Sequence, residues 1–262
     1  MTNEIHQTAI VSPEAKLGKE VKIGPYSIVG AGVTLGDNVS IGPHAVVEGD
    51  TVIGDNTFIS QFASIGSPPQ DTAGMADNAR LVIGKDNIIR EAVTINTGTK
   101  KGGGLTSIGD GNLLMAYSHV AHDCRIGNNN TFANVVTLAG HVEVGDYTVI
   151  GGLVAVHQFV RIGRNSFIGG GVMTQKDIPP YIRVIQSMER GAKPMGLNTV
   201  GLSRRGFTEE IMTALKRAYK IVWRSGLPVD EALEELKETL GDVEEVKVFS
   251  EFIRTSERGI VR

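Results

Sequence analysis

The chain of 262 residues has a formal net charge of −3 and contains one cysteine, Cys124. A lone cysteine excludes an internal disulfide and a zinc site built from cysteine pairs, so a cytoplasmic location is expected. The sequence has no run of about 20 apolar residues, and residues 1–14 lack the basic and apolar regions of a signal peptide. We therefore expect no integral membrane contact and no export.

A six-residue repeat dominates the first two thirds of the chain. The positions that share it, all aliphatic except one phenylalanine, are Val11, Leu17, Ile23, Val29, Leu35, Ile41, Val47, Ile53, Ile59, Ile65, Ile83, Ile89, Ile95, Ile108, Leu114, Val120, Ile126, Phe132, Leu138, Val144, Ile150, Val156, Ile162 and Ile168. Helices have periods of three and four and extended strands a period of two, so neither explains this spacing. A short strand followed by a sharp turn does, and glycine, at 33 residues, suits such turns.

Three of these units complete one coil, and stacked coils bury a continuous apolar column. The pattern resembles that of hexapeptide-repeat proteins, whose coils are left-handed although most crossover connections are right-handed. The predicted fold is a β protein, a left-handed parallel β-helix of hexapeptide repeats over residues 1–180. A linker and a C-terminal α-helical domain are predicted over residues 181–262.

Two segments interrupt the repeat, and both are predicted to be excursion loops. Residues 67–79 are polar and rich in turn-forming types, and Ile65 and Ile83 are three repeats apart, the length of one coil. Residues 99–106 contain three consecutive glycines and add seven residues between Ile95 and Ile108. Long loops in compact folds are often functional, although a tolerated surface insertion is the alternative.

Helical spacing replaces the six-residue repeat after Pro179-Pro180. Thr208 is predicted to cap a helix that ends near Gly226. A second helix is predicted after Pro228, and a third is predicted over 243–256.

Positive charge is concentrated in residues 161–225, which contain twelve Lys or Arg and four acidic residues, a local net charge of +8. Such a segment would attract an acidic protein or phosphate groups, although a solvated face is the alternative. Nucleic acid is not expected as a partner, because no aromatic stacking residues accompany the basic ones.

The coil of three repeats predicts which side chains stack. His122 should stack against Gly140 and Gln158, about 4.8 Å apart from coil to coil, and Asp123 against His141. Imidazole is suited to accept a proton from a hydroxyl at neutral pH, and the Gly140 N–H can stabilise an oxyanion. Asp123 can orient His122 only if the backbone turns between them, because neighbours on a strand point to opposite sides.

Other chemistries are less well supported by the sequence. His119 and His122 would project from opposite sides of a strand, so no shared metal site is expected there. Cys124 has no evident base beside it, and no nucleophile elbow occurs. Direct transfer with a general base is the simpler mechanism, and no cofactor is expected.

Four segments carry a resemblance to a known family. They are HVAHDC at 119–124, LAGHV at 138–142, AVHQF at 155–159 and GLSRRGF at 201–207. With these motifs the sequence resembles, over nearly all 262 residues, the UDP-N-acetylglucosamine 3-O-acyltransferases that begin lipid A synthesis. The resemblance implies a cytoplasmic homotrimer that transfers a 3-hydroxyacyl group from acyl carrier protein, on whose phosphopantetheine the acyl group is carried, to a UDP-sugar.

The resemblance also implies roles for individual residues. His122, Asp123 and Gly140 would be catalytic, with His122 as the general base for the sugar 3-hydroxyl. The expected substrate-binding residues are Gln70, Asp71, Asn96, His119, His141, Gln158, Gly170, Asn198, Arg204 and Arg205. Gly170 would occupy the place where the family measures acyl length, and the basic segment would receive the acidic carrier protein.

The chain departs from the family pattern near the expected sugar site. Asn96-Thr97 stands where the family has His-Arg, Ala73 stands near the usual lysine, and residues 187–190 replace a Gly-Asn-Pro-like stretch. Cationic side chains would make charge-assisted contacts with the diphosphate, so their absence leaves open an acceptor other than the usual sugar. The alternatives are N-acylation of a 3-amino UDP-sugar, a catalytically weak paralogue, and a histidine-bound metal lyase of the β-helix class.

Overall fold

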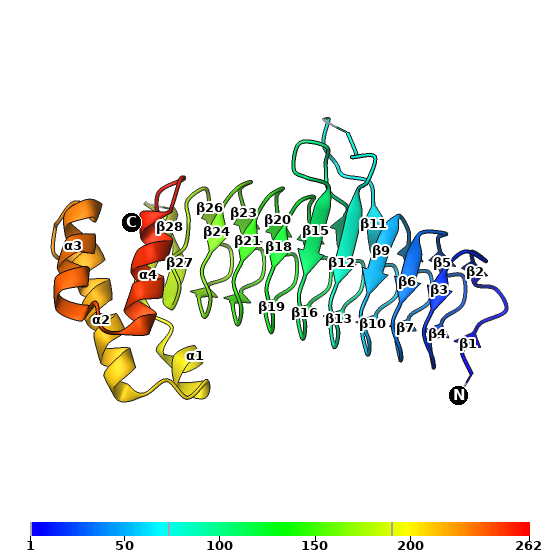
Figure 1. Ribbon diagram of the computed structural model, residues 1–262, viewed down its shortest axis with the longest axis horizontal. Helices are drawn as coiled ribbons and strands as arrows, with labels where there is room; N and C mark the ends of the chain where they lie inside the picture. The colour runs from blue at the N-terminus through cyan, green and yellow to red at the C-terminus, as the bar shows by residue number, and fades with distance from the viewer. Residues whose placement is uncertain (1, 73, 190) are drawn as a thin grey trace.

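The computed structural model describes residues 2–72, 74–189 and 191–262. Within them the chain forms a long prism of stacked coils, with helices packed at the end where the last coils lie (Figure 1). Two residues singled out in the sequence, Ala73 and Arg190, lie outside the described part. The prism has three sheets, because each coil contributes one short strand to each side.

Sheet 1 is the longest side of the prism. Its strands pair in parallel up to β27, and β27 and β28 form an antiparallel hairpin. Its strands are β1 (Glu4–Ile5), β4 (Lys22–Ile23), β7 (Ser40–Ile41), β10 (Phe58–Ile59), β13 (Ile88–Ile89), β16 (Leu113–Leu114), β19 (Thr131–Phe132), β22 (Val149–Ile150), β25 (Phe167–Ile168), β27 (Ile182–Ser187) and β28 (Gly191–Leu197). Sheet 1 thus extends past residue 180, where the sequence placed the domain boundary.

Sheets 2 and 3 form the other two sides. Sheet 2 contains β2 (Ile10–Val11), β5 (Ile28–Val29), β8 (Val46–Val47), β11 (Ser64–Ser67), β14 (Thr94–Asn96), β17 (His119–Val120), β20 (Thr137–Leu138), β23 (Ala155–Val156) and β26 (Met173–Thr174). Sheet 3 contains β3 (Lys16–Leu17), β6 (Val33–Leu35), β9 (Asp50–Ile53), β12 (Arg80–Ile83), β15 (Leu105–Ile108), β18 (Arg125–Ile126), β21 (Glu143–Val144) and β24 (Arg161–Ile162). We name the edges by the sheets they join, as the 1–2, 2–3 and 3–1 corners.

The repeat positions fill the interior of the prism as predicted. From Ile23 onward these residues are buried, and Phe132 lies fully buried among the aliphatic side chains. At roughly 25 cal/mol per Å² of apolar surface, this column is the main source of the stability of the β-helix. The corners have left-handed backbone conformations even at non-glycine residues, for example Asp123 with φ 59° and His141 with φ 62°.

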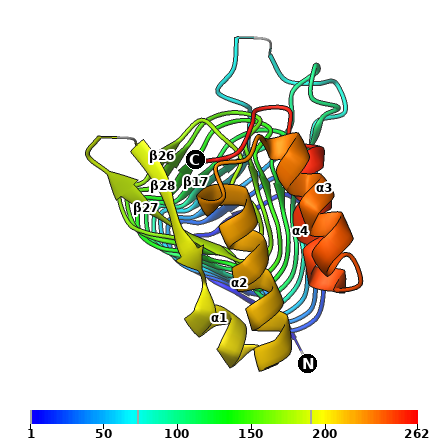
Figure 2. The ribbon, with the colours of Figure 1, turned by 90° about the vertical axis from the view of Figure 1, so that its left-hand side faces the viewer.

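The two excursion loops are inserted at the 2–3 corner and lie side by side (Figures 1 and 2). The second adds seven residues, as predicted, because Ile89 pairs with Leu114. The expectation that Ile65 and Ile83 span one coil is wrong, because Ile83 pairs with Ile53, five repeats earlier in the chain. The first loop therefore inserts two repeat lengths into a coil of three, and the repeat keeps its phase because the insertion is a whole number of repeats.

Four helices follow the hairpin in the described part of the chain: α1 (Thr199–Arg204), α2 (Glu209–Arg224), α3 (Val229–Leu240) and α4 (Glu244–Arg254). The predicted cap of the long helix is confirmed, since the Ile211 N–H donates to Thr208 Oγ1. The sequence missed α1, whose cap is Asn198. It also missed the hairpin, and the segment after α4, which returns to the β-helix through a bridge between Asp177 and Ile260.

Candidate active site

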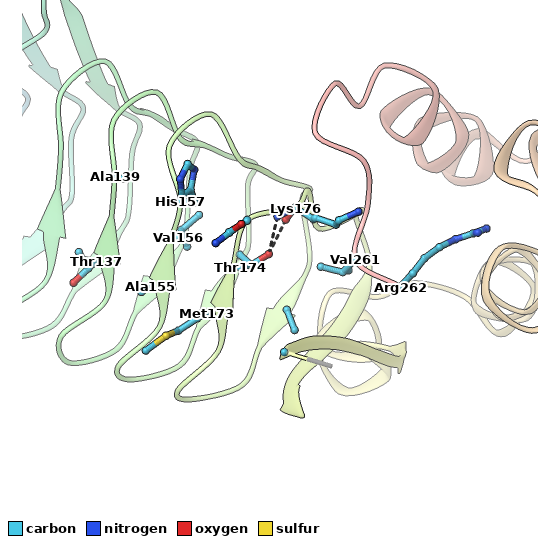
Figure 3. A pocket seen from close by; sticks show the side chains of 13 residues that line it. Thr137, Ala139, Ala155, Val156, His157, Met173, Thr174, Lys176, Val261 and Arg262 are labelled. Carbon is cyan, nitrogen blue, oxygen red and sulfur yellow. Dashed lines mark hydrogen bonds between the residues drawn. The ribbon is translucent and has the colours of Figure 1, made fainter. Parts of the chain in front are cut away.

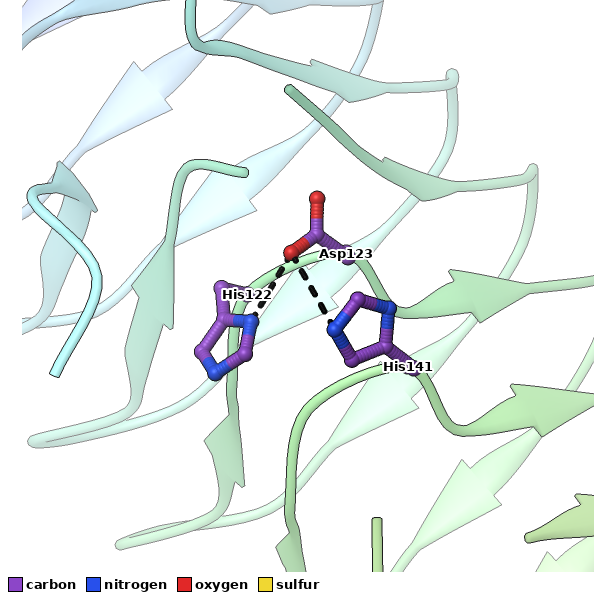
Figure 4. A group of neighbouring side chains, drawn as sticks. All are labelled: His122, Asp123 and His141. Carbon is purple, nitrogen blue, oxygen red and sulfur yellow. Dashed lines mark hydrogen bonds and ion pairs between the residues drawn. The ribbon is translucent and has the colours of Figure 1, made fainter. Parts of the chain in front are cut away.

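The candidate site lies at the 2–3 corner, just after β17. His122 and Asp123 are adjacent, and the left-handed conformation of Asp123 turns its carboxylate to the same side as the imidazole. His122 Nδ1 lies 2.8 Å from Asp123 Oδ2 (Figure 4). The backbone turn on which the role of Asp123 depended is therefore present. Because a carboxylate only accepts, Nδ1 carries a proton in this contact, so the ring can act as a base only through Nε2.

The second excursion loop holds the Asp123 carboxylate in place. Thr99 Oγ1 donates to Asp123 Oδ2 at 2.7 Å, and the Thr99 N–H lies 3.1 Å from both carboxylate oxygens. The Asp123 side chain is only 2% exposed, so these bonds compensate for the burial of its charge. Sequence analysis did not identify Thr99, although it lies in the loop whose length was singled out.

The first excursion loop covers the other side of the imidazole. Asp71 Oδ2 lies 3.5 Å from His122 Nε2, and His122 as a residue is only 6% exposed. His122 is thus enclosed between two carboxylates, whereas its position on a bare coil would leave it facing solvent. An acceptor hydroxyl that replaces the Asp71 contact would reach Nε2 directly.

Gly140 lies one coil beyond His122, as the spacing of three repeats predicted. A Cβ atom at this position would lie 2.6 Å from His122 Nε2, so only glycine leaves space for the ring. Among the residues that the structure describes, the Gly140 N–H donates to none. A general base and an unused amide donor therefore lie next to each other.

His141 completes the cluster. Its ring meets His122 edge-on at 5.2 Å and stacks on Phe159 at 4.4 Å, and its Nε2 lies 3.7 Å from Asp123 Oδ2. Burial lowers the pKa of His141 more than the Asp123 carboxylate raises it. A neutral His141 can donate or accept a hydrogen bond without adding a positive charge beside His122.

His119, which was expected to bind substrate, and His157 lie outside this cluster. His119 bonds through Nδ1 to Thr94 on the neighbouring strand of sheet 2, at 2.7 Å. His157 Nδ1 lies within hydrogen-bond distance of the main-chain oxygen of Gln158 and of Arg258 Nη2. Gln158 itself is exposed and follows Gly140 in the predicted stack.

We expect stability to fall as the pH falls below about 6.5, in part through His119. Burial, followed by the nearby His122, lowers the pKa of His119 from its usual 6.5, so the unfolded chain binds a proton that the folded chain resists. The contribution of neutral His119 to the free energy of unfolding is fully present above pH 6.5 and is lost as the pH falls toward the lowered pKa. The melting temperature of His119→Gln should depend less on pH between 7.5 and 5.5 than that of an exposed control, His6→Gln. Equal slopes would contradict the assignment.

Asn96 anchors the first loop. It is 3% exposed, and its Nδ2 donates to the main-chain oxygen of Pro68 at 3.0 Å. Its Oδ1 has no hydrogen-bond partner among the described residues. The structure therefore shows Asn96 supporting the loop that carries Gln70 and Asp71, and its direct contact with substrate remains a prediction.

The remaining predicted residues lie at other corners of the same chain. Gly170 follows β25 at the 1–2 corner. Arg205 lies 4.9 Å above the Tyr147 ring at the 3–1 corner. Asn198 is 7% exposed and is held inside, donating to the Asn165 main-chain oxygen while it caps α1. One chain alone does not bring these residues to His122.

Ligand atoms of His122, Asp123 and His141 lie within 4.8 Å of one another, a spacing that suits a metal ion. The contacts in the structure account for the cluster without an ion, because Asp123 already accepts from His122 and Thr99. A cysteine nucleophile is a poor alternative, because burial raises the pKa of the Cys124 thiol to about 12. The geometry favours a general base acting beside an amide donor.

Comparison with known proteins agrees with this geometry. A curated acyl-[acyl-carrier-protein]–UDP-N-acetylglucosamine O-acyltransferase from Thermodesulfovibrio yellowstonii is 48% identical over 262 residues, covering 99% of this chain and all of the relative. One from Stenotrophomonas maltophilia is 45% identical over 98% of this chain and 97% of its own. The chain belongs to the UDP-N-acetylglucosamine O-acyltransferase family.

Family models and solved structures also relate the chain to this acyltransferase family. The model described as UDP N-acetylglucosamine O-acyltransferase domain 2 matches residues 177–261, and the bacterial transferase hexapeptide model matches 14–49, 32–67 and 105–140. The solved UDP-N-acetylglucosamine acyltransferase of Francisella novicida is 42% identical with a TM-score of 0.94, covering 98% of this chain and 94% of its own. That of Bacteroides fragilis is 39% identical with a TM-score of 0.94, covering 98% and 99%.

The likeness to these acyltransferases confirms the predicted left-handed β-helix with its C-terminal helical domain, and the protein is an acyltransferase. None of the helices in the described ranges combines the length and hydropathy needed to span a bilayer.

Proposed function

We propose that this protein transfers a 3-hydroxyacyl group from acyl carrier protein to the 3-hydroxyl of UDP-N-acetylglucosamine. The observation that carries the proposal is the contact between the His122 ring and Gly140, with Asp123 bonded to the far side of the ring. The names of the relatives support the two substrates. This function requires no cofactor beyond the phosphopantetheine of the carrier.

His122 and Gly140 act on opposite partners of the reaction. Nε2 of His122 takes the proton of the sugar hydroxyl as its oxygen attacks the thioester carbonyl carbon. The Gly140 N–H stabilises the negative charge that develops on the carbonyl oxygen. When the C–S bond breaks, the imidazolium returns its proton to the sulfur, leaving the ester and the free pantetheine thiol. Asp123 keeps the ring oriented and stabilises its charged form.

The acceptor is best tested with a panel of UDP-sugars and carrier-linked acyl chains. We expect UDP-N-acetylglucosamine to be acylated on oxygen faster than a 3-amino analogue is acylated on nitrogen. An O-acyl product from His122 catalysis would support the proposal. Efficient acylation of the amine alone would overturn the choice of acceptor, and turnover lost on metal removal would favour a metal enzyme.

A homotrimer would supply the parts that one chain keeps apart. His122, Gly170 and Arg205 lie at three different corners, so a site that uses all three must form between copies. The 1–2 corner offers a surface for such contacts, since exposed Tyr26 and Phe62 stack on His44 and the row continues along the prism. The further exposed apolar residues at this corner are Tyr117, Val135 and Leu153. An exposed row of this kind, apolar except for His44, supports an interface at this corner.

We expect Phe62→Asp to shift the protein from trimer toward monomer, because the change places a charge in the apolar row, where Phe62 is 61% exposed in one chain. Sedimentation velocity measures the result. Leu105→Asp on sheet 3, where Leu105 is 43% exposed, is the matched control and should remain trimeric. An unchanged mass for Phe62→Asp would place the interface elsewhere.

Arg204 and Arg205 are proposed to bind the nucleotide. They line a cavity of about 710 Å³ together with Arg183 and Asn198, and guanidinium groups bind phosphate through paired hydrogen bonds. Exposed cations on α2, such as Lys216 and Lys220, offer a surface for the acidic carrier. The cytoplasmic location remains a prediction that rests on the lone reduced cysteine.

Reversing both charges, Arg204→Glu with Arg205→Glu, should raise the KM for the UDP-sugar at least ~10-fold, with a larger effect at low salt. Arg205 also donates to the Gly201 main-chain oxygen, so circular dichroism must show that α1 is retained. Steady-state kinetics at low and high ionic strength measure the effect. Unchanged KM values under both conditions would remove these arginines from the binding site.

A further inference from the structure

The C-terminal segment 255–262 returns from α4 to the β-helix and is fixed there at several points. Ser256 Oγ donates to Asp177 Oδ2 at 2.8 Å, and Asp177 is 1% exposed. The Asp177 N–H donates to the Gly259 main-chain oxygen, and Trp223 Nε1 donates to that of Val261 at 2.8 Å. A buried carboxylate and two further bonds thus set the position of Arg258, which lies between them.

Arg258 lies beside the candidate active site. Its Nε donates to the main-chain oxygen of Gln175 at 2.9 Å, which orients the guanidinium, and its Nη2 lies 3.3 Å from His157 Nδ1. It also lines a cavity of about 350 Å³ with Asp123, His141 and Phe159. The mechanism proposed above gives Arg258 no role.

The guanidinium bears on which nitrogen of His157 carries the proton. Arginine only donates, so its contact requires a lone pair on Nδ1 and leaves the proton on Nε2. The main-chain oxygen of Gln158, 3.1 Å from Nδ1, would favour the opposite arrangement. The Arg258 contact is the longer one, at 3.3 Å, but a charged donor forms the stronger bond and would be repelled by a second N–H, which favours the Nε2–H form.

The other side of His157 lines a cavity suited to an acyl-pantetheine arm. This cavity of about 630 Å³ has an apolar part that includes Ala155, Met173 and Val261 (Figure 3). Its polar part includes Thr174 and Lys176. An arm with apolar stretches and amide carbonyls matches this mixture better than a nucleotide does. An N–H on His157 Nε2 can donate a hydrogen bond to an amide carbonyl of such an arm.

We propose that Arg258 is a positioning residue that holds His157 as the Nε2–H tautomer, so that His157 donates a hydrogen bond to the acyl donor. The identity of the acyl donor rests on the proposed function, whereas the tautomer of His157 does not depend on it. It assigns the C-terminal segment a part in binding the acyl donor, in addition to closing the end of the β-helix.

Kinetics with matched variants test the proposal. Arg258→Ala should raise the KM for acyl carrier protein ~10-fold, the scale of one hydrogen bond to a charged or oriented group, and leave the KM for the UDP-sugar unchanged. Arg254→Ala removes the same charge from an arginine that pairs with Glu251 on α4, and should match the wild type. Guanidinium ions should partly restore Arg258→Ala and have no effect on Arg254→Ala.

A double-mutant cycle shows whether Arg258 acts through His157. The double variant of Arg258→Ala and His157→Ala should lose no more than His157→Ala alone. Additive losses, or an unchanged KM for the carrier in Arg258→Ala, would overturn the proposal. Arg258→Lys keeps a charge but cannot bond both Gln175 and His157, and it provides the same comparison if the alanine variant does not fold.

The tautomer is measured without turnover, so the two proposals can fail separately. In protein with ¹⁵N-labelled histidine, the His157 signals should show the Nε2–H form in the wild type and a shift toward the Nδ1–H form in Arg258→Ala. An identical tautomer in both would overturn the role of Arg258 even if the enzyme is active. A wild type and an Arg254→Ala variant without acyl transfer would instead refute the proposed function.

Discussion

His122→Ala should lower kcat/KM for acyl transfer at least ~10²-fold, the scale of a lost general base. The ring bonds to Asp123 on one side and meets Asp71 on the other, so its removal takes away the proton acceptor while both loops remain. The oligomeric state and the melting temperature should change little, because the ring packs at a corner and outside the apolar column. Steady-state rates with carrier-linked substrate provide the measurement.

Exposed His6 supplies the control for this experiment, and His6→Ala should retain wild-type rates. Asp123→Asn is a second test of the role of His122, because an amide in place of the carboxylate can no longer stabilise an imidazolium. Full activity in His122→Ala would mean that another group accepts the proton. Asp71 would then be the nearest candidate.

Gly140→Ala should lower kcat by about 10²-fold even though the amide N–H remains, since displacing a reacting group by about 1 Å has costs of that order. The new Cβ would overlap the His122 ring and lie 2.6 Å from its Nε2. The ring must move away from the amide, so base and oxyanion donor lose their alignment. The KM values should change less than kcat.

Gly30→Ala is the matched control, because Gly30 follows a strand of the same sheet and its Cβ would come no closer than 3.3 Å to a neighbouring atom. If the effect of Gly140→Ala acts through His122, combining it with His122→Ala should add little further loss. Independent, multiplying losses would show that Gly140 acts in some way other than by contact with the ring.

The β-helix could be predicted because one simple period determines it. The six-residue spacing identified the buried column, and the coil of three repeats placed Gly140 beside His122. The second loop adds seven residues, which changes the phase of the repeat, so the sequence shows its length. The first loop adds two whole repeat lengths and leaves the phase unchanged, so the spacing from Ile65 to Ile83 was misread as one coil.

The parts that escaped prediction depend on contacts that no period encodes. Thr99 and Asp71 reach the site from loops whose paths are set by tertiary packing. The antiparallel hairpin after Tyr181 and the return of the C-terminal segment to Asp177 depend on the end of the β-helix, where coils stop stacking. The dispersal of Gly170 and Arg205 to separate corners appears only in three dimensions.

A crystal structure with UDP-N-acetylglucosamine bound tests the central claim most directly. We predict that the sugar 3-hydroxyl replaces Asp71 beside His122 and lies within hydrogen-bond distance of Nε2, while Nδ1 stays on Asp123. The hydroxyl should also lie near the unused Gly140 N–H. A sugar bound with its 3-hydroxyl away from His122, and with Nε2 still facing Asp71, would contradict the proposed mechanism.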